Sequence, residues 1–128
     1  MLDVKNNNGP SSSRASRKSL KNNILTRKTD FQKAYAQGRR FFTDPFVMHY
    51  MPNALGHDRF GFTVSKRIGN AVLRNRVRRI LKEVVRNSLV SGSSQNYDII
   101  LIARRGIEQT VYSELAETYR KYLRRLPR

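Results

Sequence analysis

Apolar side chains recur along the chain with two different spacings, one typical of helices and one typical of strands. Residues 26–38 carry apolar side chains on one helical face, with Thr29 as a possible N-cap and Gly38 as a stop signal. Residues 46–51 and 59–65 alternate between apolar and polar side chains, which predicts two strands with a turn between them. The first half of the chain is therefore predicted to contain one helix and two strands.

The second half is predicted to begin with a long amphipathic helix over residues 71–88. Residues 97–103 are largely apolar without alternation, which indicates a central strand that is covered on both faces. A last helix is predicted over residues 110–125, where apolar side chains again follow helical spacing. Helices and strands are mixed along the chain, so the pattern favours an α+β sandwich in which helices pack on a sheet.

Composition adds a strong charge imbalance. The 128 residues carry 26 Lys and Arg against 9 Asp and Glu, for a formal net charge of +17. This charge favours association with polyanions such as nucleic acid or an anionic membrane, and the length predicts one domain. Residues 1–23, rich in Asn, Ser, Lys and Arg, are predicted to be a disordered basic tail, either inert or an arm on RNA. Residues 24–128 are left as the single folded domain.

Several classes of protein are disfavoured. The longest apolar run, residues 99–103, is far shorter than the roughly 20 residues of a membrane-spanning helix, and no secretory signal is recognisable. The chain has no Cys, and its two histidines, His49 and His57, lack the spacing of zinc motifs, so no metal site is predicted. The cytoplasm is the expected location, although the Ser- and Arg-rich N-terminus also resembles an organelle transit peptide.

The helix predicted over residues 71–88 has an unusual distribution of charge. Eight Lys and Arg and a single acid, Glu83, lie between Lys66 and Arg86. Cations four residues apart form a continuous ridge, and each such pair destabilises a helix by about 0.2–0.5 kcal/mol. Arg74 and Arg76 lie near the N-terminus of the helix, where the helix dipole disfavours cations. Folding alone does not explain this ridge, which consists of Arg74, Arg78, Lys82 and Arg86.

The residues that precede this helix complete a possible phosphate site. Gly69 and Asn70 supply a tight turn and an N-cap, and backbone N–H groups at the start of a helix bind phosphate well. Arginine adds bidentate phosphate contacts that lysine does not form. We therefore interpret the helix as a nucleic-acid contact, with a merely solvated basic face as the alternative. Charge alone does not separate RNA from DNA as the partner.

The stretch SKRIGNAVLRNRVRRILKE, residues 65–83, resembles the Arg-Asn-Arg signature of the bacterial ribonuclease P protein subunit. The segments DFQKAY, GFTVSKR and IILIARR support the resemblance, which covers about residues 24–125. It implies an α+β, two-layer α/β sandwich in the order α-β-β-β-α-β-α, similar to the second domain of a small-subunit ribosomal protein. It also implies a left-handed βαβ crossover, although about 98% of such crossovers are right-handed.

The same resemblance implies a subunit without catalytic residues of its own. Its large RNA partner would hold Mg²⁺ and remove the 5′ leader of precursor tRNA, while the protein binds both the catalytic RNA and the leader. We expect a monomer that binds the ribonuclease P RNA one to one. The residues implied to bind that RNA are Lys66, Arg67, Asn70, Arg74, Asn75, Arg76, Arg78, Arg79, Lys82 and Arg86.

The resemblance further implies that the leader lies in a cleft between the first helix and the sheet. Aromatic side chains that stack on bases contribute about 1–3 kcal/mol per base and tolerate any leader sequence. Tyr35 stands where the family usually has Phe, and His49 stands where Tyr is expected. Phe31 and Tyr35 are alternatively core residues, and Arg104 and Arg105 a solvated strand end. The implied leader-binding residues are Phe31, Tyr35, Val47, His49, Arg104 and Arg105.

Two other functions remain open from the sequence. A structural RNA-binding protein of ribosomal type would share the basic helix and the fold, but it needs no exposed aromatic side chain that faces a single strand. A basic DNA-compacting protein would show no preference for folded RNA. A protein nuclease would need clustered carboxylates for two metal ions, whereas acids such as Asp44 and Asp58 are scattered along the chain.

Overall fold

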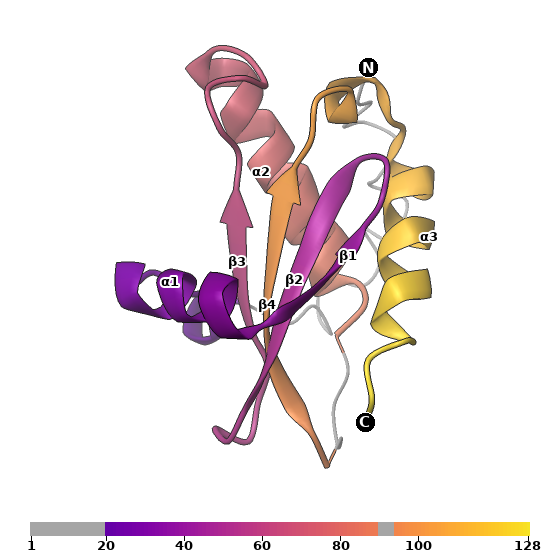
Figure 1. The fold of residues 1–128 in the computed structure, drawn as a ribbon. Helices are drawn as coiled ribbons and strands as arrows, with labels where there is room; N and C mark the ends of the chain where they lie inside the picture. The colour runs from indigo at the N-terminus through magenta and orange to yellow at the C-terminus, as the bar shows by residue number, and fades with distance from the viewer. Residues whose placement is uncertain (1–19, 90–93) are drawn as a thin grey trace.

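The computed structural model describes residues 20–89 and 94–128. In this part of the chain, three α-helices and a four-stranded sheet are joined by loops, with one 3₁₀ turn before the first helix and another after the last strand (Figure 1). In chain order the elements are η3 (Lys21–Asn23), α1 (Lys28–Gln37), β1 (Arg39–Phe42), β2 (Phe46–Asn53), β3 (Arg59–Thr63), α2 (Ala71–Arg86), β4 (Asn96–Ala103), η4 (Ile107–Gln109) and α3 (Tyr112–Leu123).

The strands lie in the order β1-β2-β4-β3. β1 pairs with β2 and β2 with β4 in antiparallel fashion, whereas β3 and β4 are parallel. β4 therefore lies between two neighbours, and six of its eight residues are buried. This confirms the prediction that residues 97–103 form a central strand covered on both faces.

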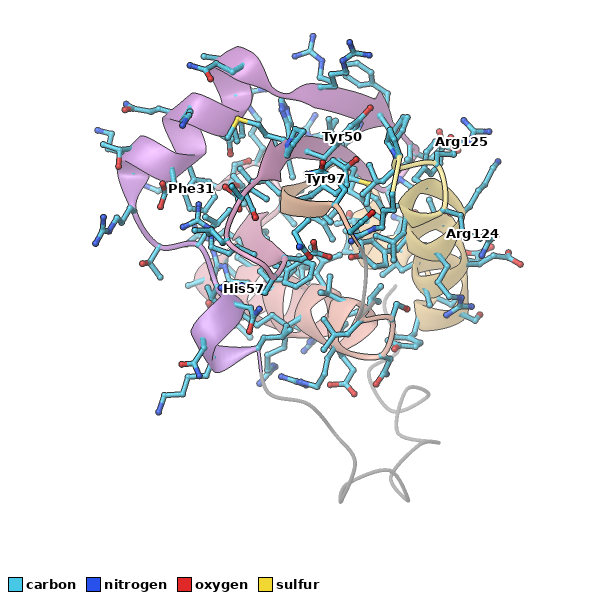
Figure 2. The ribbon with its side chains drawn as sticks, turned by 90° about the horizontal axis from the view of Figure 1, so that it is seen from below. Phe31, Tyr50, His57, Tyr97, Arg124 and Arg125 are labelled. Atoms are coloured by element: carbon cyan, nitrogen blue, oxygen red, sulfur yellow. The ribbon has the colours of Figure 1, made fainter. Side chains whose placement is uncertain are left out.

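The connection from β3 through α2 to β4 is left-handed. Figure 1 shows the arrows of β3 and β4 pointing the same way, with β4 to the right of β3 and α2 behind the sheet. Figure 2, seen from below, again places α1 and α2 on opposite sides of the sheet. The α+β sandwich and its left-handed crossover, which the resemblance implied, are thus confirmed against the general preference for right-handed connections.

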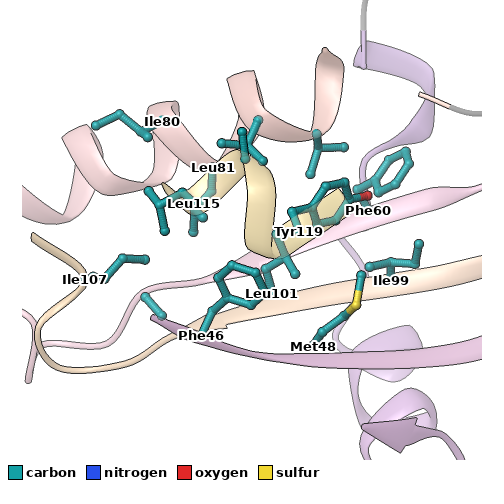
Figure 3. Close-up of a cluster of buried hydrophobic side chains, with 14 of the residues drawn as sticks. Phe46, Met48, Phe60, Ile80, Leu81, Ile99, Leu101, Ile107, Leu115 and Tyr119 are labelled. Carbon is teal, nitrogen blue, oxygen red and sulfur yellow. The ribbon is translucent and has the colours of Figure 1, made fainter. Parts of the chain in front are cut away.

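The two faces of the sheet bury cores of different size. The larger core fills the space between the sheet and helices α2 and α3, where Phe46, Leu101 and Tyr119 meet (Figure 3). The smaller core lies between α1 and the opposite face of the sheet. α1 therefore covers much less of this face than α2 and α3 cover of the other. The smaller core consists of Leu25, Ala34 and Ile100, with Phe31 and Ile102 packed against it.

Some element boundaries differ from the sequence-based expectations. Alternation did not reveal β1, a short and mostly exposed edge strand that only the resemblance implied. α1 begins after Arg27, so Thr29 lies inside the helix and is not its N-cap. β2 continues through Pro52, which is tolerated because β1 ends earlier and leaves that part of β2 without a neighbour on one side. α3 is two residues shorter at each end than the predicted 110–125.

The packed part of the chain begins before residue 24. Leu20 is only 4% exposed and belongs to the larger core, and η3 follows it directly. The predicted boundary between tail and domain is therefore corrected, because residues 20–23 belong to the fold. Residues 1–19, the rest of the predicted tail, lie outside the described residues, as do residues 90–93 of the predicted loop before β4.

A buried carboxylate joins three strands and α1 at one end of the sheet. Asp98 on β4 is 2% exposed and accepts hydrogen bonds from the Nε and Nη2 groups of Arg59, at 2.9 and 2.7 Å. The Asn53 amide on β2 donates a third hydrogen bond to it, at 2.8 Å. Arg59 also reaches Asp30 of α1, at 3.3 Å. Such a charge is stable inside a protein only while its partners remain.

Replacing Arg59 by Met is expected to lower the free energy of unfolding by about 3 kcal/mol, because Asp98 would stay buried without its cationic partner. The double variant Arg59→Met, Asp98→Leu should recover most of this loss, since it removes the buried charge as well. Urea denaturation followed by circular dichroism measures both. A loss below about 1 kcal/mol for Arg59→Met, typical of exposed ion pairs, would contradict this role.

Candidate nucleic-acid interface

The start of α2 is defined by its cap. The Asn70 side chain accepts a hydrogen bond from the backbone N–H of Leu73 at 2.9 Å, which confirms the predicted N-cap. Gly69 precedes it with φ of 156°, and a Cβ at this position would lie 2.7 Å from Leu73 Cδ2. The φ angle therefore favours glycine here, and the exposed Lys66 and Arg67 precede it in the same loop.

α2 separates apolar from charged side chains as the sequence predicted. Its buried residues are all aliphatic, and they pack into the larger core between the sheet and α3. Arg79 is exposed, while the stems of the other α2 cations are half-buried along the flanks. The buried residues are Val77, Ile80, Leu81, Val84 and Val85, and the half-buried cations are Arg74, Arg76, Arg78, Lys82 and Arg86.

Few of these cations have a partner within the described residues. Arg86 forms an ion pair with Glu83 at 2.5 Å, the only ion pair of an α2 cation in the described part of the chain. Arg78 donates a hydrogen bond to the Asn75 side chain at 2.8 Å, which fixes the guanidinium without neutralising it. The Nε group of Arg74 is buried and has no hydrogen-bond partner there. α2 thus presents a surface of mostly uncompensated positive charge.

The face of the sheet beneath α1, here called the α1 face, brings together four of the predicted leader-binding residues. Phe31 of α1 rests on Gly61 of β3, where an added Cβ would lie 2.8 Å from the Phe31 ring. Gly61 pairs with Ile100, which in turn pairs with His49, so the register places all three in one row across the sheet. Because Gly61 has no side chain, the Phe31 ring can pack directly against β3. Figure 2 shows Phe31 on α1.

Tyr35 connects α1 to two strands of this face. Its ring meets His49 edge-on, with ring centroids 4.9 Å apart, and its hydroxyl lies 3.1 Å from Thr63 Oγ1. Its ring centroid is 6.2 Å from that of Phe31, and the Tyr35 side chain is still 39% exposed. Val47 is half-buried on the same face, two residues before His49 in β2. Tyr35 is therefore the member of this group most accessible to a ligand.

His49 is the most buried member of the group, at 6% exposure. Burial, together with Arg40 opposite it on β1, lowers the pKa of its imidazole from the usual 6.5. Its Nδ1 atom is buried without a hydrogen-bond partner in the described part of the chain. The neutral ring packs against Tyr35, and it does not present an exposed stacking surface of its own.

The two predicted arginines after β4 lie apart from the α1 group. The guanidinium of Arg104 donates a hydrogen bond to the Thr43 carbonyl in the β1–β2 hairpin at 2.6 Å, and its backbone N–H bonds to Pro45. Arg105 is exposed in the turn that follows. Because β3 and β4 are parallel, this turn lies at the same end of the sheet as the loop before α2 (Figure 1).

Sequence reasoning missed one exposed aromatic residue on the α1 face. Phe42 of β1 pairs with Val47, so both side chains share that face, and Phe42 is 62% exposed. The Arg40 guanidinium lies 5.0 Å from the centroid of the Phe42 ring. The available signal was the run RRFF directly before the turn residues Asp44 and Pro45, which indicates a short edge strand.

The described residues offer no grouped metal ligands. Across residues 20–89 and 94–128, His, Asp and Glu side chains do not gather in threes around a common point. In the same part of the chain, no helix has the length and apolar character needed to cross a membrane.

The family model described as Ribonuclease P matches residues 20–127 of this chain. A ribonuclease P protein component from Caldanaerobacter subterraneus is 39% identical over 103 residues, which cover 80% of this chain and 88% of that protein. The corresponding protein component from Clostridioides difficile is 32% identical over 101 residues, which cover 79% of this chain and 89% of that protein.

Two solved structures have a similar fold. The RNase P protein from Staphylococcus aureus superposes with a TM-score of 0.68 at 30% identity, covering 80% of this chain and 93% of that one. The RNase P protein from Thermotoga maritima superposes with a TM-score of 0.71, covering 82% and 98%. The second structure is 22% identical, so its likeness shows the fold alone.

Replacing His49 by Gln is expected to reduce the pH dependence of stability. The pKa of His49 is lowered in the folded protein, so as the pH falls through 6.5 the unfolded chain takes up the proton first, and the free energy of unfolding decreases. This contribution should be missing from His49→Gln when urea denaturation at about pH 7.5 and about pH 5.5 is compared. Identical pH dependence in the unaltered protein and His49→Gln would contradict the assignment.

Proposed function

The chain belongs to the ribonuclease P protein family, and on this premise we propose that α2 binds the catalytic RNA while the α1 face holds the 5′ leader of precursor tRNA. Family membership makes the chain an RNA-binding component of an endoribonuclease that processes tRNA, with the ribonuclease P RNA as its partner. The assignment of the catalytic RNA to one surface and of the leader to the other is our proposal.

The charge of α2 is the observation that carries the proposal. A single ion pair, Arg86 with Glu83, compensates the cations of this helix within the described residues. Phosphate would supply the missing counter-charge, and arginine binds it in bidentate fashion. The loop with Lys66 and Arg67 would extend the same surface past the Asn70 cap, so that loop and helix dock on the RNA together.

The α1 face supports the assignment of the leader. A leader differs in sequence from one precursor to the next, so its site needs contacts that every base can form, such as stacking on an aromatic ring. Tyr35 is exposed and Phe31 half-buried on this face, so both rings are within reach of a single strand. His49 would act by holding Tyr35 in place, since its own ring is buried.

We further propose that the RNA carries out the hydrolysis, with Mg²⁺ held by the RNA. The two most buried carboxylates of the described residues are already bound to arginines: Asp98 to Arg59, and Asp58 to Arg128 at 2.8 Å. Asp58 also accepts a hydrogen bond from the backbone N–H of Tyr97, at 2.8 Å. These two carboxylates stabilise the fold. We therefore propose that the protein binds and orients its RNA partners and does not itself catalyse the hydrolysis. We propose that the protein acts in the cytoplasm, as a monomer bound one to one with the RNA.

The proposal is tested by a cleavage assay at low Mg²⁺ with this protein, a bacterial ribonuclease P RNA and a 5′-extended tRNA. We expect cleavage at the mature 5′ end only when protein and RNA are combined, because the protein adds binding energy that the RNA lacks at low Mg²⁺. Protein alone and RNA alone serve as controls. If the protein binds the RNA but does not promote cleavage, a structural RNA-binding role of ribosomal type would replace the proposal.

The affinity of the protein for the catalytic RNA is expected to fall steeply with salt. About 6–10 phosphate contacts would weaken binding by ~10³–10⁵ between 50 and 200 mM salt. Replacing the exposed Arg79 by Gln should reduce the slope of log K against log [salt] by about one. Arg124→Gln is the matched control, because Arg124 is exposed at the C-cap of α3, away from α2 (Figure 2). Filter binding measures both slopes, and equal slopes for the two variants would contradict docking through α2.

A further inference from the structure

The tip of the β1–β2 hairpin and α3 enclose an open hollow that the assignments above do not use. Its volume is about 440 Å³, within the range of small-ligand sites. The hairpin, the residue after β4 and α3 all line it, and they contribute Phe42, Asp44, Arg104, Thr118, Lys121 and Tyr122. The hollow therefore combines the residues Tyr122, Arg104, Lys121, Asp44 and Thr118, and Phe42 lies at its edge.

Phe42 lies at the edge between this hollow and the α1 face. It borders the hollow from β1, while its pairing with Val47 places its side chain on the α1 face, where the leader is proposed to lie. At 62% exposure, the Phe42 ring is the most exposed aromatic side chain of the described residues, and Arg40 lies 5.0 Å from its centroid. A single strand that leaves the α1 face at the β1 edge would meet this ring next.

The cations of the hollow are held near its rim. The Arg104 guanidinium is tied to the Thr43 carbonyl by a hydrogen bond of 2.6 Å, which leaves its other N–H groups for a ligand. Lys121 is exposed, with its Nζ atom 5.5 Å from the centroid of the Tyr122 ring. The other cation near that ring, Arg125, lies 4.9 Å from its centroid. The lining is thus positively charged around aromatic surfaces, which is the chemistry of single-stranded nucleic-acid sites.

We infer that a nucleotide of the single-stranded leader binds across the β1 edge, with its base against Phe42 on the α1 face and its phosphate in the hairpin hollow between Arg104 and Lys121. The inference rests on the proposed function and extends it. In the sheet order, β3 lies beside the α2 surface and β1 lies farthest from it. A leader that starts at the RNA-bound α2 surface would cross the sheet and reach the hollow last. The hollow would therefore bind only long leaders.

The test compares precursor tRNAs with leaders of about 3 and about 12 nucleotides, a range that spans common single-strand site sizes. The complex of protein and ribonuclease P RNA is titrated with each precursor. We expect Phe42→Ala to weaken binding of the long-leader precursor by about fivefold, the lower end of stacking on one ring, and to leave the short-leader precursor unchanged. Lys121→Gln should also act only on the long leader and should lower its salt slope.

Two exposed residues provide matched controls. Leu55 is 51% exposed in the β2–β3 turn, and Arg120 is exposed on α3 without lining the hollow. Leu55→Ala and Arg120→Gln should leave both affinities unchanged. A loss for Phe42→Ala that is equal at both leader lengths, or no loss at either length, would overturn the hairpin-hollow site.

Phe31→Leu separates failure of this inference from failure of the proposed function. The substitution keeps an apolar contact with Gly61 but removes the ring, so it should weaken binding at both leader lengths. If Phe31→Leu acts at both lengths while Phe42→Ala acts at neither, the α1 face still binds the leader and only the hollow is refuted. If Phe31→Leu changes nothing with either leader, the proposed leader site itself fails.

Discussion

The need to bury both faces of β4 determines where the rest of the molecule lies. Six of the eight residues of this strand are buried, so each of its faces requires a covering layer. α2 and α3 supply one layer through the larger core, and α1 supplies the other through a much smaller one. Because α1 is short, it leaves part of the α1 face uncovered. The exposed ring of Tyr35 and the exposed Phe42 border this uncovered part.

The charge of α2 is compatible with folding because its apolar contacts are stronger. Three pairs of like charges four residues apart destabilise the helix by about 1 kcal/mol in total. Five aliphatic residues buried by the same helix each contribute about 1.5–3 kcal/mol. The core therefore holds the helix in place, although a single ion pair, Arg86 with Glu83, compensates its cations within the described residues.

Much of this arrangement could be predicted from the sequence, for identifiable reasons. α2 and β4 have long apolar patterns, so their positions and burial followed directly from spacing, as did the Asn70 cap. The alternation of apolar and polar residues did not predict β1, because an exposed edge strand of four residues has no buried face to produce it. The seat of Phe31 on Gly61, the position of Arg104 beside Thr43 and the burial of His49 depend on pairing between distant strands, which local spacing does not encode.

The position of β4 also determines when the protein can fold during its synthesis. β3 and β4 pair in parallel, for example Arg59 with Asp98, and α2 lies between them in the chain. Before β4 leaves the ribosome, β1 and β2 can pair as a hairpin, whereas β3 has only the single bridge of Phe60 to Ile24. Closing such a distant contact is slow and leaves apolar strands exposed in the nascent chain. We therefore expect the domain to fold in one late step, in which the central strand and the orientation of α2 are established together.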